Sequence, residues 1–126
     1  DAAVDALLEK GGELMERRDL LEAELVFTQM IRKAPEFAEG WNKRATVRYL
    51  AENYEAAIAD CRETLTRNPS HFGALSGQGL CHIALGQLRE AVACFRRALA
   101  VHPHLEGART NLASAMGAAI RGNGHA

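Results

Sequence analysis

Three histidines are the residues of this sequence best suited to bind a metal ion. His102 and His104 flank Pro103 in the sequence His-Pro-His, and His71 precedes them in a similar junction between two apolar segments. A zinc site needs three or four ligands in a tetrahedral arrangement, and the spacing places no third ligand beside this pair. We therefore predict no metal site and no bound cofactor.

Cys81 and His82 are the residues that most resemble a nucleophile and its base. A catalytic pair needs hydrogen-bond contact, whereas sequence neighbours on a helix point about 100° apart. Cys94 lies beside Phe95, which is typical of a packed thiol. The sequence has no Gly-rich phosphate loop and no carboxylate pair in a catalytic context. We therefore predict that the chain is not an enzyme.

Composition narrows the class of partner. The chain has 126 residues, is 48% apolar and 25% charged, and carries a net charge of −1. Nucleic-acid and membrane-surface proteins usually carry a basic excess, so no nucleic acid is expected, and Arg17–Arg18 and Arg96–Arg97 are read as solvated helix faces. No run approaches the roughly 18 apolar residues of a membrane span, which predicts a soluble chain without membrane insertion.

Cysteine usage favours a reducing compartment, the cytoplasm or a plastid stroma. The three cysteines are odd in number and form no CxxC pair, which suits free thiols better than a disulfide framework. The sequence begins with DAAV, so we expect a piece of a longer chain from which a targeting segment could have been removed.

The elements that position these residues follow from the prolines. Pro35, Pro69 and Pro103 are 34 residues apart, which predicts repeats over 4–37, 38–71 and 72–105. Other positions recur at the same spacing and are expected to be buried: Gly11, Ala45 and Gly79; Ala23, Ala57 and Ala91; Phe27, Cys61 and Phe95; and Met30, Thr64 and Ala98.

Each repeat is predicted to be two helices of about 14 residues, because the apolar residues keep helical spacing and no strand alternation occurs. Asp19 followed by Glu22 forms a capping-box pattern, and Asn53 occupies the equivalent cap. After Pro103 a lone helix over 106–121 is expected to cap the array, with Leu112, Ala113 and Met116 facing inward. Residues 122–126 are predicted to be a flexible tail.

A 34-residue helix–turn–helix with these residues resembles the tetratricopeptide repeat. The matching residues are Gly11, Ala23, Phe27 and Pro35 in the first repeat; Trp41, Ala45, Tyr54, Ala57 and Pro69 in the second; and Gly79, Gly86, Ala91, Phe95, Ala98 and Pro103 in the third. The resemblance covers about residues 4–121. It implies an all-α fold, a right-handed α-solenoid of antiparallel helix pairs with seven helices in a single domain over 1–121, and a core position for Trp41.

The sequence departs from the family's pattern at several positions. Leu7 and Leu75 replace the large aromatic residue that Trp41 supplies. Arg48 and His82 stand where the family prefers tyrosine, and Cys61 replaces an aromatic residue. We expect a locally looser core around the second repeat.

The resemblance implies protein recognition in a concave groove lined by the first helices. Carried over by register, the predicted groove residues are Leu8, Asn42, Lys43, Thr46, Tyr49, Gly73, Ser76, Gly77, Leu80, Ile83, Thr110 and Asn111. Asparagine amides can donate and accept, which suits the backbone of a bound peptide. The expected partner is a protein or peptide, and the expected role is that of an adaptor or scaffold. The alternative is self-association as a homodimer or larger homo-oligomer, with repeat ends or the groove packing on another copy.

One activity of the family is predicted to be absent. Its chaperone-tail binders hold a terminal carboxylate with lysine, asparagine and arginine at fixed places. In this register those places hold Leu8, Gly12, Lys43, Gly73 and Gly77. None of the five is the residue type that its own place requires. The chain is therefore not expected to be a carboxylate clamp for EEVD tails.

Overall fold

The computed structural model describes residues 1–124, which form seven α-helices and no strand. The helices are α1 Ala2–Glu16, α2 Leu20–Lys33, α3 Ala38–Leu50, α4 Tyr54–Arg67, α5 Phe72–Ala84, α6 Leu88–Val101 and α7 Glu106–Gly124. The chain divides into two compact units, residues 1–69 with α1 to α4 and residues 70–126 with α5 to α7. The predicted all-α fold with seven helices is confirmed, whereas the single domain over 1–121 stays a prediction.

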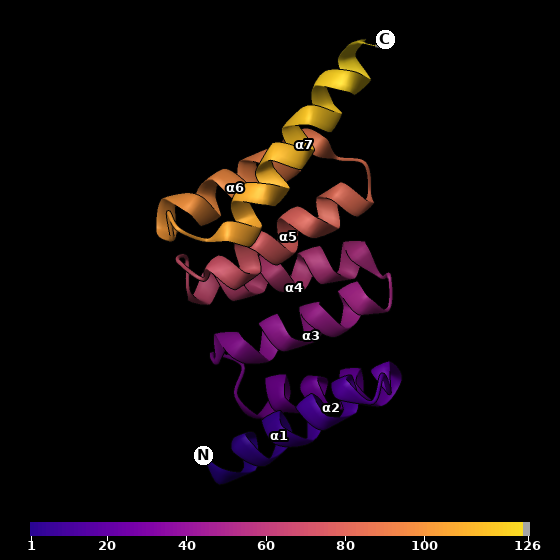
Figure 1. The fold of residues 1–126 in the computed structure, drawn as a ribbon. Helices are drawn as coiled ribbons and strands as arrows, with labels where there is room; N and C mark the ends of the chain where they lie inside the picture. Colours follow the sequence, from indigo (N-terminus) through magenta and orange to yellow (C-terminus); the bar gives the residue numbers. More distant parts are fainter. Residues whose placement is uncertain (125–126) are drawn as a thin grey trace. The chain divides into compact units, whose positions relative to one another are not determined.

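Within each unit, consecutive helices pack side by side and antiparallel (Figure 1). In the first unit α1 pairs with α2 and α3 with α4, and α2 also contacts α3. In the second unit α6 packs against both α5 and α7. None of the described helices is long and apolar enough to cross a membrane.

The helix boundaries repeat at the interval that the prolines predict. The second helices begin at Leu20, Tyr54 and Leu88, and each ends two residues before its proline. Proline disfavours helical geometry in the residue before it, so each second helix must end there. The structure thus confirms the 34-residue repeat.

The small and large positions predicted to recur are buried in all three repeats. The alanines 23, 57 and 91 have no exposed surface, and Phe27 and Phe95 have none either. Gly11 and Gly79 face these two rings so closely that an added Cβ would lie 2.4 Å from a ring atom of Phe27 and 2.7 Å from one of Phe95. Each glycine therefore allows its helix to approach a phenylalanine of the paired helix.

The turn inside each helix pair has the same backbone geometry in every repeat. Arg18, Glu52 and Gly86 have positive φ angles of 63°, 62° and 74°. The amide of the next residue donates back to the carbonyl five residues earlier, from Asp19 to Leu14 (2.9 Å), from Asn53 to Arg48 (2.8 Å) and from Gln87 to His82 (2.8 Å). This is the Schellman arrangement that ends a helix with a left-handed residue. Only the third repeat uses glycine there.

We expect Glu52→Gly to raise the free energy of unfolding by about 0.5–1 kcal/mol. The left-handed conformation costs an L-residue about 1–2 kcal/mol, and the greater freedom of glycine in the unfolded chain offsets part of the gain. Urea denaturation measures the change. The matched control is Ala51→Gly, because Ala51 has an ordinary φ of −81° and should lose stability. Equal losses in both variants would contradict the prediction.

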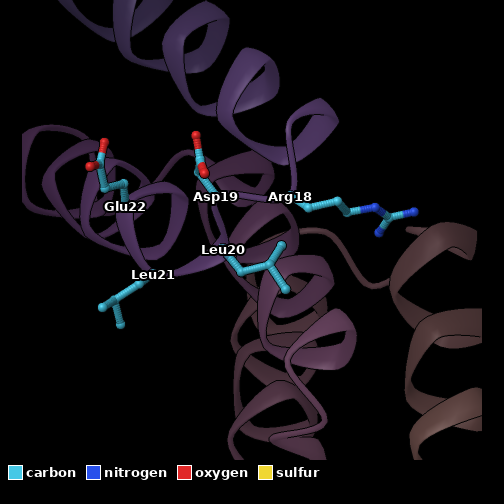
Figure 2. Close-up of a pocket in the computed structure, with 5 residues that line it drawn as sticks. All are labelled: Arg18, Asp19, Leu20, Leu21 and Glu22. Atoms are coloured by element: carbon cyan, nitrogen blue, oxygen red, sulfur yellow. The ribbon is translucent and has the colours of Figure 1, made fainter.

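The predicted capping box does not form. Asp19 and Asn53 are the N-cap residues of α2 and α4, but neither side chain makes a capping hydrogen bond. Their ψ angles of 68° and 71° lie outside the extended region from which an N-cap side chain reaches the first turn. Figure 2 shows the Asp19 and Glu22 side chains extending to the same side of the segment. The predicted cap positions are therefore confirmed, whereas the prediction of side-chain capping contacts was wrong.

The inward face of α7 differs from the prediction. Ala108 and Ala115 are buried, whereas Ala113 and Met116 are exposed. Leu112 is half-buried as expected. The inward stripe of α7 consists of Ala108, Leu112 and Ala115. Ala113 and Met116 lie outside this stripe. The helix continues to Gly124, three residues past the predicted end, and the predicted tail residues 125–126 lie outside the described residues.

Candidate functional site

The outward face of α3 carries three of the predicted groove residues on one stripe. Asn42, Thr46 and Tyr49 follow each other at helical spacing, with Thr46 exposed and the other two half-buried. The amide nitrogen of Asn42 donates to Glu39 at 2.9 Å. Since an amide offers two N–H groups and a carbonyl oxygen, Asn42 retains the capacity to bind a peptide backbone. Lys43 lies about 100° round the helix from Asn42 and is not brought onto this stripe.

Leu8 is the predicted groove residue of α1. It is partly buried and packs against the apolar cluster of the first unit that contains Val4, Leu14 and Phe27. Its side chain therefore contributes to stability as well as to the surface. Tyr49 similarly makes an edge-to-face contact with Tyr54, with ring centroids 5.7 Å apart.

The second unit presents its predicted residues on α5 and α7. Gly73, Gly77 and Leu80 lie on the side of α5 away from its buried residues, and all three are half-buried. Ser76 and Ile83 lie at the edge of this stripe, and the hydroxyl of Ser76 is buried without a hydrogen-bond partner in the described part of the chain. On α7, Thr110 is exposed and Asn111 is half-buried.

A buried ion network joins α2, α3 and α4 in the first unit. Arg44 holds the carboxylate of Asp60 with two hydrogen bonds of 2.9 and 2.8 Å, and Arg48 adds a third at 3.0 Å. Arg48 also donates to Glu24 at 2.6 Å, and Arg44 to the hydroxyl of Thr28 at 3.2 Å. Two arginines on one face of α3 are thereby fixed by acids on the helices to either side of it.

The sequence reasoning missed this network, although one signal was present. Asp60 lies among the apolar residues Ala57, Ile58 and Cys61 on the inward stripe of α4. A buried carboxylate needs partners of opposite charge, and Arg44 and Arg48 are the arginines one helix earlier. Asp60 and both arginines lie in the second repeat, and the looser core expected there stays a prediction.

Trp41 is half-buried and held by cations, so it is not the fully buried core residue that the resemblance implies. Its indole N–H donates to the carbonyl of Pro35 at 2.9 Å. The guanidinium groups of Arg67 and Arg44 lie 4.5 and 5.3 Å from the ring centroid. Arg67 donates to the same Pro35 carbonyl at 2.5 Å. The ring is thus occupied by the protein's own arginines, which argues against ligand stacking there.

The residues considered for chemistry have structural roles. His71 caps α5, and its Nδ1 accepts from the amide of Ala74 at 3.0 Å. His82 is buried, and its Nδ1–H donates to the amide oxygen of Gln87 at 2.7 Å. Burial, and secondarily the nearby Cys94, raise the pKa of the Cys81 thiol to about 11. A thiol with so high a pKa stays protonated at neutral pH, whereas a nucleophile needs the thiolate.

The five positions considered for a chaperone-tail clamp are partly accessible, and four of them carry leucine or glycine. Leu8, Gly12, Lys43, Gly73 and Gly77 are all half-buried. Lys43 is the one charged residue of the five. The fold therefore leaves all five positions partly accessible to a ligand.

Comparison with known protein families identifies a match to one family model. The model of the family described as tetratricopeptide repeat matches residues 8–72 and 43–105. A TPR repeat-containing protein of Rhizobium etli is 28% identical over 102 residues, which are 81% of this chain and 50% of that protein. The Hsp70-Hsp90 organizing protein of Triticum aestivum is 30% identical over 93 residues, 74% of this chain and 16% of that protein. The chain spans half the length of the first relative and less of the second.

Solved structures share the fold. The first TPR of Spaghetti (RPAP3), bound to the HSP90 peptide SRMEEVD, has a TM-score of 0.91 and 24% identity, with 94% of each chain covered. At this identity the likeness concerns the arrangement of the helices.

Proposed function

Because this chain belongs to the tetratricopeptide-repeat family, we propose that it is a protein-interaction module that holds a peptide or helix of a partner protein on its first helices. Its role would be that of an adaptor or scaffold. The observation that carries this proposal is the accessible stripe of Asn42, Thr46 and Tyr49 on α3. The Thr46 hydroxyl donates to the backbone carbonyl of Asn42 at 3.1 Å and can still accept a hydrogen bond, and the Asn42 side chain keeps one N–H and its carbonyl oxygen. These groups beside an aromatic ring suit recognition of an extended backbone.

The second unit supplies a matching kind of surface. Asn111 on α7 is half-buried, and Leu80 on α5 offers partly exposed apolar area. Gly73 and Gly77 add no side chain on the same face of α5, so a ligand could approach its backbone closely. We include the remaining predicted residues Leu8, Lys43, Ser76, Ile83 and Thr110 as the surroundings of this surface. Ser76 would contribute only after a local rearrangement that exposes its hydroxyl.

The test uses peptides selected from a random library displayed on phage against the wild-type chain. Asn42→Ala combined with Asn111→Ala is expected to weaken the selected peptides about tenfold, because each lost hydrogen bond contributes about 0.5–1.5 kcal/mol. Isothermal titration calorimetry measures the affinity. The melting temperature should change little, since both side chains lie outside the core.

The matched control changes exposed residues of a second helix, Glu55→Ala with Arg62→Ala on α4. These substitutions should leave peptide affinity unchanged. An unchanged affinity in the asparagine double variant would remove the two residues from the site. Equal weakening by both double variants would place the bound peptide elsewhere.

We further propose that the module does not recognise chaperone tails. The peptide SRMEEVD, labelled for fluorescence anisotropy, is expected to show no saturable binding at concentrations up to about 100 µM. Its terminal carboxylates would be desolvated with Lys43 as the single cation among the five clamp positions. The variant Leu8→Lys, Gly73→Lys, Gly77→Arg restores positive charge and should bind more tightly. A low-micromolar Kd for the wild-type chain would contradict this proposal.

A further inference from the structure

The second unit has an uncovered apolar groove between α6 and α7. It has a volume of about 320 Å³ and is lined by Arg89, Val92, Arg96, Met116, Ala119 and Ile120. Ile120 is 68% exposed and Met116 is 38% exposed, one helical turn apart on α7. Both arginines come from α6, so one side of the groove is basic and the other apolar.

The first unit has an apolar ridge on α2, formed by two exposed leucines with the same four-residue spacing as Met116 and Ile120. Leu21 is 78% exposed and Leu25 is 61% exposed, again one helical turn apart. Isolated exposed leucines are common on protein surfaces, but these two form a continuous pair. Leu21, Ile120 and Leu25 are the three most exposed large apolar residues among those described, and they belong to this ridge and this groove.

Charge distinguishes the ridge from the groove. Glu22 lies beside the two leucines, and Glu22 and Asp19 both line an open hollow of about 450 Å³. Arg18 lines the same hollow, but its side chain extends away from the two carboxylates (Figure 2). Figure 2 shows both carboxylates on one side of the segment and Leu21 on another. Glu22, Arg89 and Arg96 form no ion pair within the described part of the chain. An acidic border on the ridge therefore complements the basic border of the groove.

We propose that the groove between α6 and α7 binds the α2 ridge of a second copy of this chain. Leu21 and Leu25 would pack on Met116 and Ile120, since both pairs are separated by one turn of about 5.4 Å. Glu22 would then lie toward Arg89 and Arg96. The contact joins two different surfaces, so each bound copy leaves one ridge and one groove open for further copies.

This contact is separate from the proposed peptide-binding surface. The ridge and the basic side of the groove lie on second helices, away from the peptide-binding residues of α1, α3 and α5. The apolar side of the groove lies on α7, where Ile120 is about 180° round the helix from Asn111. Substitutions here are therefore expected to leave selected-peptide affinity unchanged, and failure of one proposal does not decide the other. Interaction through so few anchors predicts weak association.

The test is sedimentation velocity of the wild-type chain and two variants, alone and mixed. The wild-type chain should form dimers and larger species as concentration rises. Leu21→Glu with Leu25→Glu removes the ridge, and Ile120→Glu removes the groove. Each variant alone should remain monomeric, with association weakened at least about tenfold, because the ridge variant loses two exposed apolar anchors and the groove variant loses one.

The mixture of the two variants distinguishes this contact from symmetric ones. The Ile120→Glu chain keeps its ridge, and the chain with Leu21→Glu and Leu25→Glu keeps its groove. The intact ridge can therefore bind the intact groove, and the mixture is expected to form a 1:1 complex and no larger species. If the groove paired with another groove, the ridge variant alone would dimerise, and if ridge paired with ridge, the groove variant alone would do so. Either result, or a monomeric wild-type chain at millimolar concentration, overturns the proposal.

Two further variants control for charge and for general surface effects. Arg89→Glu with Arg96→Glu should weaken association, and adding Glu22→Arg to that chain should restore part of it. Ala59→Glu is the matched surface control, because Ala59 is exposed on α4 at the position equivalent to Leu25. It should leave association unchanged, and a loss equal to that of the ridge variant would overturn the proposal.

Discussion

Asp60→Ala is expected to lower the free energy of unfolding by about 3 kcal/mol, at the low end of the range for breaking a buried ion pair by removing one partner. The Asp60 side chain is 2% exposed and accepts three hydrogen bonds from two arginines. Its removal leaves Arg44, 14% exposed, without a carboxylate partner, and leaves Arg48, 22% exposed, with Glu24 alone. Because both arginines stay partly hydrated, we expect the loss of stability at the low end of the range for buried ion pairs. Urea denaturation monitored by circular dichroism measures the loss.

The control for Asp60 is Glu63→Ala on the same helix. Glu63 pairs with Arg67 at 2.7 Å but is 47% exposed, and such i,i+4 pairs contribute about 0.2–0.5 kcal/mol. Asp60→Asn keeps an acceptor but removes the charge, so its loss should fall between the two. Similar losses for Asp60→Ala and Glu63→Ala would mean that the network does not stabilise the fold.

Gly11→Ala is the second substitution expected to have a large effect. The new methyl group would lie 2.4 Å from two ring atoms of Phe27, and the ring is fully buried. Overpacking of this kind costs about 1–3 kcal/mol. It would outweigh the gain in helix propensity, so a net loss of about 1–2 kcal/mol is expected. The unfolding midpoint in urea gives the sign and the size.

Gly12 provides an internal comparison one residue along the same helix. A Cβ at Gly12 meets no atom within 4 Å, so Gly12→Ala should stabilise the chain by up to about 1 kcal/mol. Adding Phe27→Leu to Gly11→Ala should recover part of the loss, because the smaller side chain leaves room for the methyl group. Stabilisation by both alanine substitutions would show that the first helix pair can separate at little cost.

The fold was predictable because its determinants are local and repeated. Proline disfavours helical geometry in the residue before it, so Pro35, Pro69 and Pro103 indicated the ends of the second helices. The glycines at 11 and 79 required close helix packing, which the structure contains. Left-handed turns at Arg18 and Glu52 were less predictable, since neither residue favours that conformation and only Gly86 indicates it.

The features that the sequence did not predict correctly depend on contacts between helices or on neighbouring turns. The capping box depends on the ψ angle of one residue, which the Schellman turn before Asp19 determines rather than the cap sequence. The inward face of α7 depends on the direction from which α6 packs, and a helix rich in alanine gives little amphipathic contrast at 113 and 116. The Asp60 network joins residues of three helices. Pairing across helices cannot be deduced from the spacing within one of them.

The sequence predicted which positions of the candidate site are accessible, but not which ligand they would bind. Register alone identified accessible positions, since none of the twelve predicted groove residues is fully buried. It could not reveal that the Ser76 hydroxyl is enclosed or that Leu8 shares in the core. The residue types on a binding surface depend on the partner, because folding alone does not determine which side chains stand at exposed positions.

The position of Trp41 makes the two units separately observable by spectroscopy. Trp41, Tyr49 and Tyr54 are the tryptophan and both tyrosines of the chain, and all lie in the first unit. The indole contacts with Pro35, Arg44 and Arg67 exist only while α3 and α4 are folded together. Intrinsic fluorescence therefore reports melting of residues 1–69, whereas far-ultraviolet dichroism follows all helices. Coincident curves would indicate one cooperative folding unit, and separate curves would indicate two.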